Sequence, residues 1–258
     1  MITRPDEQKI LAQTHLESFH FYQSLASTND TARALADDTA VPALVIAAEQ
    51  FAGRGQNSNR WWSGPGSLTC SWITNTNQEV ASNLSALAAA VAASNAIRSI
   101  DAALKPTAKW PNDIYLGQSK VAGILVETIL VKGTRKMIVG IGVNTNCSIK
   151  DAPPELRSKA TSVCDHLDRK IDQDRFLISL INEFYAQFTR LETDSASILD
   201  DFRSISMFRP DQKISWSTAG KRKETGKFAG IGSHGELLVR LNAQTHKIIS
   251  ATIEEFQL

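Results

Sequence analysis

One alanine-rich stretch, residues 82–104 (SNLSALAAAVAASNAIRSIDAAL), limits what this 258-residue chain can fold into. Alanine has the highest helix propensity of the amino acids, and its short side chain lets a helix approach its neighbour closely. The stretch is the clearest helix in the sequence. We expect its alanines to pack closely against a β-sheet, so that helix and sheet share one core.

Three strand candidates follow this helix and indicate what kind of sheet it meets. They are residues 107–110 (TAKW), 121–131 (VAGILVETILV) and 136–146 (KMIVGIGVNTN). The turn signals PND (111–113) and KG (132–133) separate them. Strands joined by such short turns pair with their neighbours in the chain, so the sequence predicts an antiparallel meander.

The N-terminal part predicts further strands and a short helix. Residues 18–28 match a strand that ends in a helix start, with Ser27 or Thr28 as the N-cap. Residues 43–50 form a continuous apolar run, which suits a strand buried on both faces. Residues 67–73 alternate between apolar and polar side chains and predict another strand.

The C-terminal third changes from helices to short strands. Residues 172–194 predict an amphipathic helix with Asp172 or Asp174 at its acidic N-terminus, and a shorter helix is expected near 195–206. From about residue 208, short strands alternate with glycine turns, which suggests a small barrel.

These patterns together predict an α+β protein with two domains. Residues 1–207 are expected to form a mixed, largely antiparallel sheet packed with helices, and residues 208–258 a small β domain. The length fits one medium domain plus a small one, and 42% apolar with 21% charged residues is an ordinary globular composition.

Composition also excludes several classes of partner. A formal net charge of +1 argues against a broad nucleic-acid-binding face, which needs a basic excess. The three cysteines form no CxxC pair and indicate neither a disulfide framework nor a zinc site. The N-terminus has no apolar leader, and no segment approaches the roughly 18 apolar residues of a membrane span. We therefore expect a cytoplasmic protein with no nucleic-acid and no membrane partner.

The stretch GRGQNSNRWW (53–62) is the first candidate for chemistry. It matches neither a Walker A loop nor GxGxxG. One interpretation is a mobile surface loop with its tryptophans tucked into the core. The other is a binding loop, because glycines let the backbone approach a ligand, arginines pair with phosphate or carboxylate, and tryptophan stacks on rings.

A second candidate is KWPNDIYLGQSKVAGILVE (109–127). Asn112 and Asp113 either simply form a turn or face a ligand at the strand junction. Lys120 precedes an apolar strand, where it is either a solvated edge charge or a cation aimed into a site. Glu127, at the far end of that strand, is a candidate partner of Lys120 or another edge charge.

The third candidate, GIGVNTN (140–146), carries glycines inside a predicted strand. Such glycines mark a bulge, tight packing against the alanine-rich helix, or close approach of a ligand. Both the structural and the ligand interpretation stay open at this point.

Taken in order, these segments resemble the biotin protein ligases, enzymes that attach biotin to carboxylases. The matching segments are STN (27–29), EQFAGRGQ (49–56), RWWS (60–63), KWPNDIYL (109–116), KVAGILVE (120–127), GIGVNTN (140–146) and ATSV (160–163). The C-terminal residues 209–241 resemble the small SH3-like domain of the family. KWPND followed by KxxGILxE is a highly specific combination.

The resemblance implies both a fold and a reaction. The fold is a class II synthetase-like catalytic domain with a C-terminal SH3-like β-barrel. Such enzymes join biotin to AMP, with release of pyrophosphate, and then pass the biotinyl group to one lysine of a carrier domain. The implied substrates are biotin and ATP with Mg²⁺, and the implied partner is the biotin carboxyl carrier protein of an acetyl-CoA carboxylase.

The family's motifs also imply roles for individual residues. Those matched to biotin are Ser27, Thr28, Asn29, Gln50, Gly53, Arg54, Gly55, Gln56, Lys120, Gly123 and Gly142. Those matched to ATP or AMP are Arg60, Trp61, Asn112 and Asn144. Lys120, Arg54 and Asp113 match the catalytic positions. Lys120 is expected to contact the biotin carboxylate and the α-phosphate, Trp61 to cover the adenine, and Asp113 to bind Mg²⁺ or to help deprotonate the acceptor lysine.

The chain departs from the family in two places. Many members have a second arginine after GRG, where this chain has Gln56, and more basic residues at 57–59. With fewer cationic contacts to phosphate, the adenylate is expected to be held less firmly. Only some 26 residues precede STN, too few for the helix-turn-helix domain of repressor members. We therefore expect a monofunctional ligase that binds no operator DNA.

Two other functions compete with this one. Lipoate–protein ligases share the fold and a central lysine, but GRGQ, KWPND and the C-terminal β domain favour biotin. A non-catalytic biotin sensor or scaffold on the same fold need not keep the adenylation residues Arg54, Lys120, Asn112 and Asp113. Exposed sheet edges permit a homodimer, since the family contains both monomers and dimers.

Overall fold

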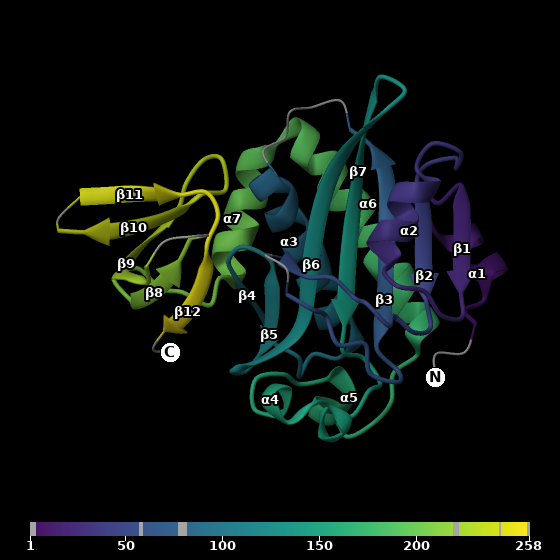
Figure 1. Ribbon diagram of the computed structural model, residues 1–258, viewed down its shortest axis with the longest axis horizontal. Coiled ribbons are helices and arrows are strands. Elements are labelled where there is room, and N and C mark those ends of the chain that lie inside the picture. Colours follow the sequence, from purple (N-terminus) through teal and green to yellow (C-terminus); the bar gives the residue numbers. More distant parts are fainter. Residues whose placement is uncertain (1–3, 57–58, 77–81, 219–221, 243, 257–258) are drawn as a thin grey trace.

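Two β-sheets with helices around them make up the computed structural model (Figure 1). The larger sheet has seven strands in the order β1-β2-β3-β7-β6-β5-β4. They are β1 (Ser18–Tyr22), β2 (Ala43–Ala47), β3 (Leu68–Asn75), β4 (Pro106–Lys109), β5 (Asp113–Leu116), β6 (Ser119–Val131) and β7 (Thr134–Val143). The structure describes residues 4–56, 59–76, 82–218, 222–242 and 244–256.

Pairing within this sheet is antiparallel except at one edge, where β1 and β2 run parallel. The predicted mixed, largely antiparallel sheet is therefore confirmed. The predicted meander is also confirmed, and it has one more strand than expected. β5 begins at Asp113, the last residue of the predicted turn, and is too short for its alternation to stand out in the sequence.

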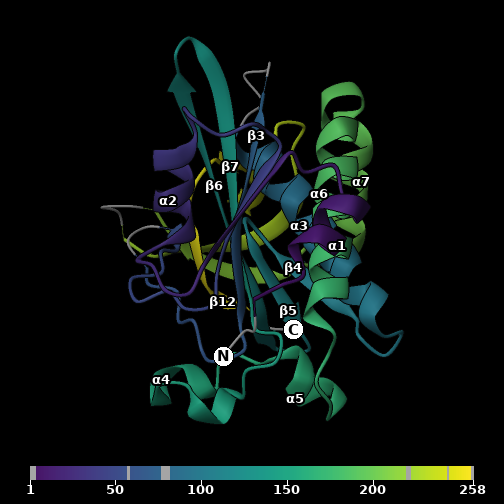
Figure 2. The same cartoon turned by 90° about the vertical axis from the view of Figure 1, so that its right-hand side faces the viewer.

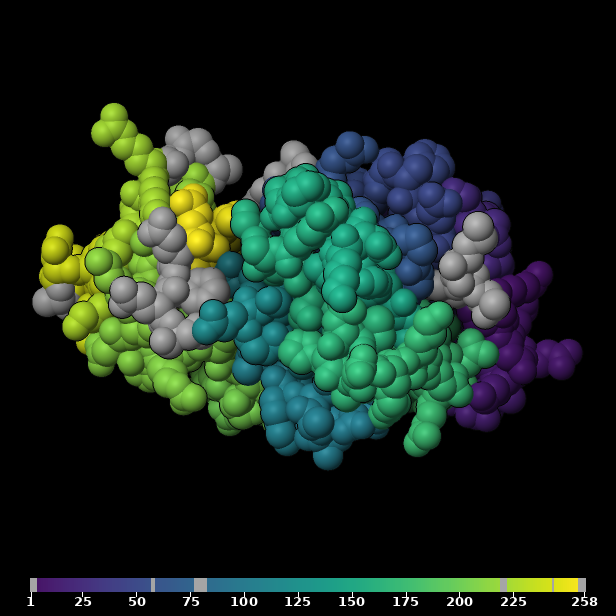
Figure 3. Space-filling model, turned by 90° about the horizontal axis from the view of Figure 1, so that it is seen from below, coloured from purple at the N-terminus to yellow at the C-terminus, as the bar shows by residue number. Residues whose placement is uncertain are grey.

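Helices cover both faces of the large sheet. The helices of the chain are α1 (Glu7–Gln13), α2 (Thr28–Leu35), α3 (Ser82–Ile100), α4 (Pro154–Arg157), α5 (Val163–Leu167), α6 (Gln173–Thr193) and α7 (Ser195–Ile205), and the 3₁₀ turn η2 spans Ile149–Asp151. Figure 2 shows α1, α3, α6 and α7 on one face and α2 on the other. Seen from below, the segment that carries α4 and α5 covers the end of the sheet (Figure 3).

The alanine-rich helix α3 occupies the position that its composition predicts. It contacts β4, β5 and β6 of the sheet, and on its other sides it contacts α6 and α7. Its alanines at 88, 89, 90, 92 and 93 are at most 1% exposed. The expected close packing against a sheet is confirmed, and the same small side chains also let α6 approach.

Strand β2 is buried on both faces, as its unbroken apolar run predicts. Leu44 and Ile46 belong to the main core with α3 and α6, whereas Val45 and its two alanine neighbours belong to a smaller cluster under α2. Successive side chains of a strand point to opposite faces of the sheet. Because β2 meets a hydrophobic cluster on each face, every one of its positions has to be apolar.

The smaller sheet contains the C-terminal strands. They are β8 (Lys213–Ser217), β9 (Glu224–Ile231), β10 (Leu237–Leu241), β11 (Gln244–Ile248) and β12 (Thr252–Phe256). Their order is β11-β10-β9-β8-β12, and no pairing between β11 and β12 occurs among the described residues. The predicted short strands are confirmed, but the observed sheet is open, so closure into an SH3-like barrel stays a prediction. Part of the expected strand segment, residues 220 and 221, lies outside the described residues.

The two sheets share one hydrophobic core. Trp216 and Phe228 of the small sheet belong to the same cluster of buried side chains as α3 and α7. Polar contacts add to the junction, because Trp110 Nε1 donates a hydrogen bond of 2.9 Å to the Gly235 carbonyl. Arg203 Nη2 donates to the carbonyl of Ile231 at 2.8 Å.

Helix ends agree with the sequence in most places. The Asp172 carboxylate accepts a hydrogen bond from the Arg175 N–H and caps α6. Ser27 is the N-cap residue of α2, but its side chain makes no capping bond. The helices α1, α4 and α5 and the turn η2 are not predicted, since each is too short to show a helical period. Among the described helices, none has the length and apolarity needed to cross a membrane.

The packing of α3 yields a prediction about stability. Ala92 of α3 is 0% exposed, so replacing it with leucine should lower the free energy of unfolding by about 1–3 kcal/mol through overpacking. Urea denaturation measures this change. Ala186→Leu, on the exposed side of α6, is the matched control and should leave the stability nearly unchanged. Equal effects of the two substitutions would contradict the packing described for α3.

Candidate active site

A pocket lies on the face of the large sheet that carries α2. Its walls come from the start of α2, the loop between β2 and β3, the β4–β7 meander and residues 251–253 near β12. All but two of the predicted site residues line it. The predicted residues that line the pocket are Ser27, Thr28, Asn29, Gln50, Arg54, Gly55, Gln56, Arg60, Trp61, Asn112, Asp113, Lys120, Gly123 and Gly142.

The two exceptions lie just behind this surface. Gly53 is the first residue of the GRGQNSNRWW stretch, and a Cβ atom there would come 2.7 Å from the Trp61 carbonyl oxygen. Asn144 is 3% exposed, and its Nδ2 donates to the Thr161 carbonyl at 2.9 Å. Its Oδ1 is buried without a hydrogen-bond partner among the described residues. In this structure Asn144 ties the ATSV segment to the end of β7.

The start of α2 forms a buried polar corner of the pocket. Ser27, Thr28 and Asn29 are each at most 4% exposed. The hydroxyl oxygen of Ser71 on β3 lies 2.8 Å from Thr28 Oγ1 and 2.6 Å from Asn29 Oδ1. Gln50 Oε1 accepts a hydrogen bond of 2.7 Å from the Thr28 N–H. Buried polar groups held in this way can present donors and acceptors to a ligand at fixed positions.

The GRGQNSNRWW stretch (53–62), here called the glycine loop, folds back on itself over the pocket in its described residues, 53–56 and 59–62. The Trp61 N–H donates to the Gly53 carbonyl at 2.9 Å, and the Gly55 N–H donates to the Asn59 carbonyl at 2.7 Å. Arg54 and Arg60 form an isolated antiparallel bridge. The loop is thus a small hairpin-like flap rather than a surface excursion with only its tryptophans packed.

The Trp61 indole fills the middle of the pocket. A Cβ atom on Gly142 would overlap the ring, and one on Gly123 would come 3.1 Å from its Cζ3 atom. The Lys120 ammonium lies 5.7 Å from the ring centroid, a cation–π distance. Trp61 Nε1 is buried and has no partner among the described residues. The remaining cavity of about 120 Å³ is small for a ligand site because the ring occupies it.

Lys120 and Asp113 form the charged centre of the pocket. Lys120 Nζ lies 2.6 Å from Asp113 Oδ1, and both side chains are only partly exposed. The backbone of Lys120 pairs with residues 159–161, which fixes the start of β6. Asn112, 9% exposed, donates through Nδ2 to the Ile124 carbonyl at 2.5 Å. Its amide therefore holds the turn, which agrees with the structural interpretation, while it also lines the pocket.

Lys109 brings a second cation to the same end of the pocket. Its Nζ donates to the Ile253 carbonyl at 2.9 Å and lies 5.7 Å from the centroid of the Tyr115 ring. Burial lowers the pKa of Lys109 below its ordinary value, the charge of Asp113 opposes this shift, and the charge of Lys120 adds to it. Two lysines facing one carboxylate leave this end of the pocket electropositive.

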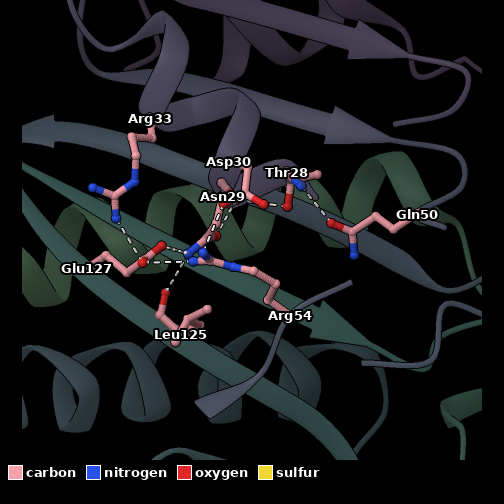
Figure 4. Close-up of polar contacts among 9 residues, drawn as sticks. Thr28, Asn29, Asp30, Arg33, Gln50, Arg54, Leu125 and Glu127 are labelled. Atoms are coloured by element: carbon pink, nitrogen blue, oxygen red, sulfur yellow. Dashed lines mark hydrogen bonds and ion pairs between the residues drawn. The ribbon is translucent and has the colours of Figure 1, made fainter. Parts of the chain in front are cut away.

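Glu127 does not occupy either of the places that the sequence suggests. Lys120 pairs with Asp113 instead, so the predicted Lys120–Glu127 pair is wrong. Nor is Glu127 an edge charge, because β6 is an interior strand and the side chain is 19% exposed. Its carboxylate bonds to Arg33 at 2.9 Å and to Arg54 at 2.7 Å (Figure 4). It also accepts a hydrogen bond from Asn29.

Several pocket residues were missed by the sequence reasoning. Residues 251–253 come from the C-terminal sheet, which the sequence assigned to a separate domain. Lys109 was recognised only as the first residue of the KWPND motif and was given no role of its own. Ser71 does not line the pocket but contacts Thr28 and Asn29, and its only signal was that it is a polar residue within a buried strand. No cluster of three or more His, Cys, Asp or Glu side chains that could hold a metal ion occurs in the described part of the chain.

Comparisons with known proteins show the family to which the chain belongs. The model of the biotin/lipoate A/B protein ligase family matches residues 21–144. The bifunctional ligase/repressor BirA of Bacillus subtilis is 31% identical over 243 residues, covering 91% of this chain and 73% of BirA. The biotin–[acetyl-CoA-carboxylase] ligase of Paracoccus denitrificans is 31% identical over 237 residues, covering 88% of this chain and 96% of the relative.

Solved structures show the same fold. The biotin protein ligase from Aquifex aeolicus, in complex with biotin and ATP, superposes with a TM-score of 0.80 at 23% identity. This match covers 93% of the present chain and 99% of the Aquifex chain. The chain belongs to the biotin/lipoate A/B protein ligase family.

The contact between Trp61 and the strand glycines can be tested directly. In Gly142→Ala, the new methyl group overlaps the indole, so Trp61 must leave the pocket and become more exposed to water. We expect the tryptophan emission of the ligand-free protein to shift to longer wavelength. The Trp61→Phe background is the control, since the same glycine substitution should cause no shift there. A shift of equal size in both backgrounds would contradict this contact.

Proposed function

We propose that this chain is a biotin protein ligase. It joins biotin to ATP, forming biotinyl-5′-AMP with release of pyrophosphate, and transfers the biotinyl group to a lysine of a carboxylase carrier domain. The observation that carries the proposal is the convergence of the separate motif segments, STN, GRGQ, KWPND, KxxG and GIG, on one pocket. The activity named for the Paracoccus relative and the biotin and ATP bound to the Aquifex structure support it.

The buried corner at the start of α2 suits the ureido head of biotin. A urea needs donors for its oxygen and acceptors for its two N–H groups. Thr28 and Asn29 offer hydroxyl and amide groups there, and Gln50 lies beside them. Gly142 and Gly123 leave the strand surface bare, so a flat apolar ring can lie against the backbone once Trp61 moves.

The electropositive end suits the nucleotide and the reacting groups. A biotin carboxylate that attacks the α-phosphate brings two anions together, and the Lys120 ammonium lowers their repulsion and stabilises the charge of the transition state. Mg²⁺ prefers oxygen ligands and commonly binds through one or two carboxylates plus substrate phosphates. Asp113 is the pocket carboxylate that fits this use, and Mg²⁺ bound there would neutralise phosphate charge.

In the second half-reaction the acceptor amine must be neutral when it attacks. A free lysine has a pKa near 10.4, so a base that accepts its proton speeds the step. Asp113 is the carboxylate at hand, held at the ammonium of Lys120. The Lys120 ammonium balances the charge on the phosphate that leaves as AMP.

The proposal extends to the partner and the domain organisation. The carrier is the biotin carboxyl carrier protein of acetyl-CoA carboxylase, and the reaction is placed in the cytoplasm. Residues 1–207 form the catalytic domain, and residues 208–258 form the SH3-like domain; the sheet of β8–β12 supports this division. A homodimer stays a prediction, which the mass of the protein in solution tests.

Transfer of labelled biotin to a carrier domain in the presence of ATP is the direct test. The wild type should transfer it, and Lys120→Ala should lower the rate about 100-fold or more, because it removes a fixed charge from the transition state. Lys105→Ala, at an exposed lysine four residues before the KWPND motif that does not line the pocket, is the matched control and should keep full activity.

Different outcomes bear on different parts of the proposal. No transfer by the wild type would refute the ligase function and favour a biotin-binding sensor. An active Lys120→Ala variant would refute only the role given to Lys120. The lipoate alternative is tested by thermal shift: biotin should raise the melting temperature, and lipoate should not. A larger shift with lipoate would favour the other branch of the family.

Gln56 yields a prediction about retention of the adenylate. Gln56 lines the pocket, and an arginine there would add a cation beside the phosphate. We expect Gln56→Arg to slow the release of biotinyl-5′-AMP about tenfold, the equivalent of one charge-assisted contact. Gln56→Met keeps the length without the charge and should release it as fast as the wild type. Equal release rates for all three proteins would contradict the prediction.

A further inference from the structure

We propose that Glu127 is a positioning residue of the ligase, which holds Arg54 and Asn29 in the places from which they meet biotin. Glu127 lies on β6 behind the pocket and does not line it. The proposal rests on the proposed function, because it assigns Glu127 to the biotin end of that same site. Figure 4 shows its carboxylate at the centre of the polar contacts between α2, the glycine loop and β6.

The two oxygens of the Glu127 carboxylate accept hydrogen bonds from different residues. Oε2 accepts a hydrogen bond of 2.8 Å from Asn29 Nδ2. Oε1 accepts bonds from Arg54 Nη2 at 2.7 Å and from Arg33 Nη2 at 2.9 Å. Asn29 Nδ2 also donates to the Leu125 carbonyl, at a longer 3.3 Å. One side chain therefore joins three others that come from α2 and from the glycine loop.

Arg54 is the point at which the glycine loop is tied to the protein on this side. Its Nη1 lies 3.0 Å from Asp30 Oδ1 on α2, and its Nη2 bonds to Glu127 on β6. The guanidinium thus bridges a helix and a strand while it lines the pocket. A planar guanidinium held at both ends has few orientations left, so its approach to a ligand is fixed in advance.

The charges in this cluster are balanced. Arg33 and Arg54 supply two cations, and Asp30 and Glu127 supply two carboxylates. Burial favours the neutral acid, but the bonds from Asn29 and Arg54 and the charges of both arginines outweigh it, so the pKa of Glu127 lies below its usual value. Glu127 is therefore ionised at neutral pH, and it is the least exposed of the four.

Arg33 provides a matched control within the same cluster. It bonds to the same oxygen of Glu127 as Arg54, yet it does not line the pocket. If Glu127 served only to fasten α2 to the sheet, loss of Arg33 would have the same consequence as loss of the Glu127 charge. If Glu127 acts through Arg54 and Asn29, loss of Arg33 should leave biotin binding intact.

The test compares Glu127→Gln with Arg33→Gln in the full chain. Biotin-dependent exchange between ATP and pyrophosphate gives KM for biotin and kcat of adenylation. We expect Glu127→Gln to raise KM for biotin about tenfold, with a smaller change in kcat and in KM for ATP. Arg33→Gln should keep KM within about twofold of the wild type.

A double substitution tests whether Glu127 acts through Arg54. Arg54→Gln alone should impair biotin binding, and adding Glu127→Gln should then have much less than its tenfold effect. A full tenfold loss in the Arg54→Gln background would overturn the proposal. An unchanged KM in Glu127→Gln, or an equal rise in Arg33→Gln, would overturn it as well.

Two further measurements keep the test decisive. Should Glu127→Gln fail to fold, Arg54→Lys replaces it: lysine keeps the charge but lacks the fork that reaches Asp30 and Glu127 together, so KM for biotin should again rise. An unchanged KM there would count against the proposal. Failure of the proposed function is recognised separately, because the wild type would then show no biotin-dependent exchange at all.

Discussion

This site depends on a strand surface that carries no side chains, because other segments of the chain must approach its backbone closely. Gly140 and Gly142 lie on one face of β7, and Gly123 on β6 is the partner of Gly142. The Asn29 side chain occupies the space that a Cβ on Gly140 would need, and the Trp61 indole does the same at Gly142. Without these glycines neither α2 nor the loop could reach the sheet. The expected bulge and the expected packing against the alanine-rich helix are both wrong for GIG. Strand β7 pairs with both neighbours without a register shift, and its glycine face meets Asn29 and Trp61 instead.

Charge divides the pocket into two ends. At one end, two arginines and two carboxylates balance in charge: Arg33 and Arg54 against Asp30 and Glu127. Arg54 therefore offers N–H donors at fixed positions and adds no excess charge there. At the other end, Lys109 and Lys120 face the single carboxylate of Asp113. An apolar ring with a polar urea suits the balanced end, and a phosphate-bearing group suits the cationic end. This polarity agrees with the order in which biotin and nucleotide would have to lie.

The sequence predicted much of this site because its signals are local. The unbroken apolar run of β2, the alanines of α3 and the cap at Asp172 each follow from a short stretch of chain. The motifs also named nearly all of the lining residues. What the sequence could not supply were pairings between distant segments. Glu127 bonds to Asn29 and Arg33 of α2 and to Arg54 of the glycine loop, which lie 98, 94 and 73 positions away in the sequence, and only the folded structure brings them together.

The contribution of the C-terminal sheet was missed for the same reason, and it changes how KWPND is understood. Lys109 bonds to the Ile253 carbonyl, Trp110 to the Gly235 carbonyl and Asn112 to the Ile124 carbonyl. Three of the five motif residues thus bond to carbonyl groups of other segments, two of which belong to the C-terminal part that carries β8–β12. The motif both connects the C-terminal part to the large sheet and lines the pocket. It brings residues 251–253 to the pocket wall, and its Asp113 faces Lys120. Because the packing contacts and the pocket contacts fall on consecutive residues, each position of such a short motif accepts few other amino acids.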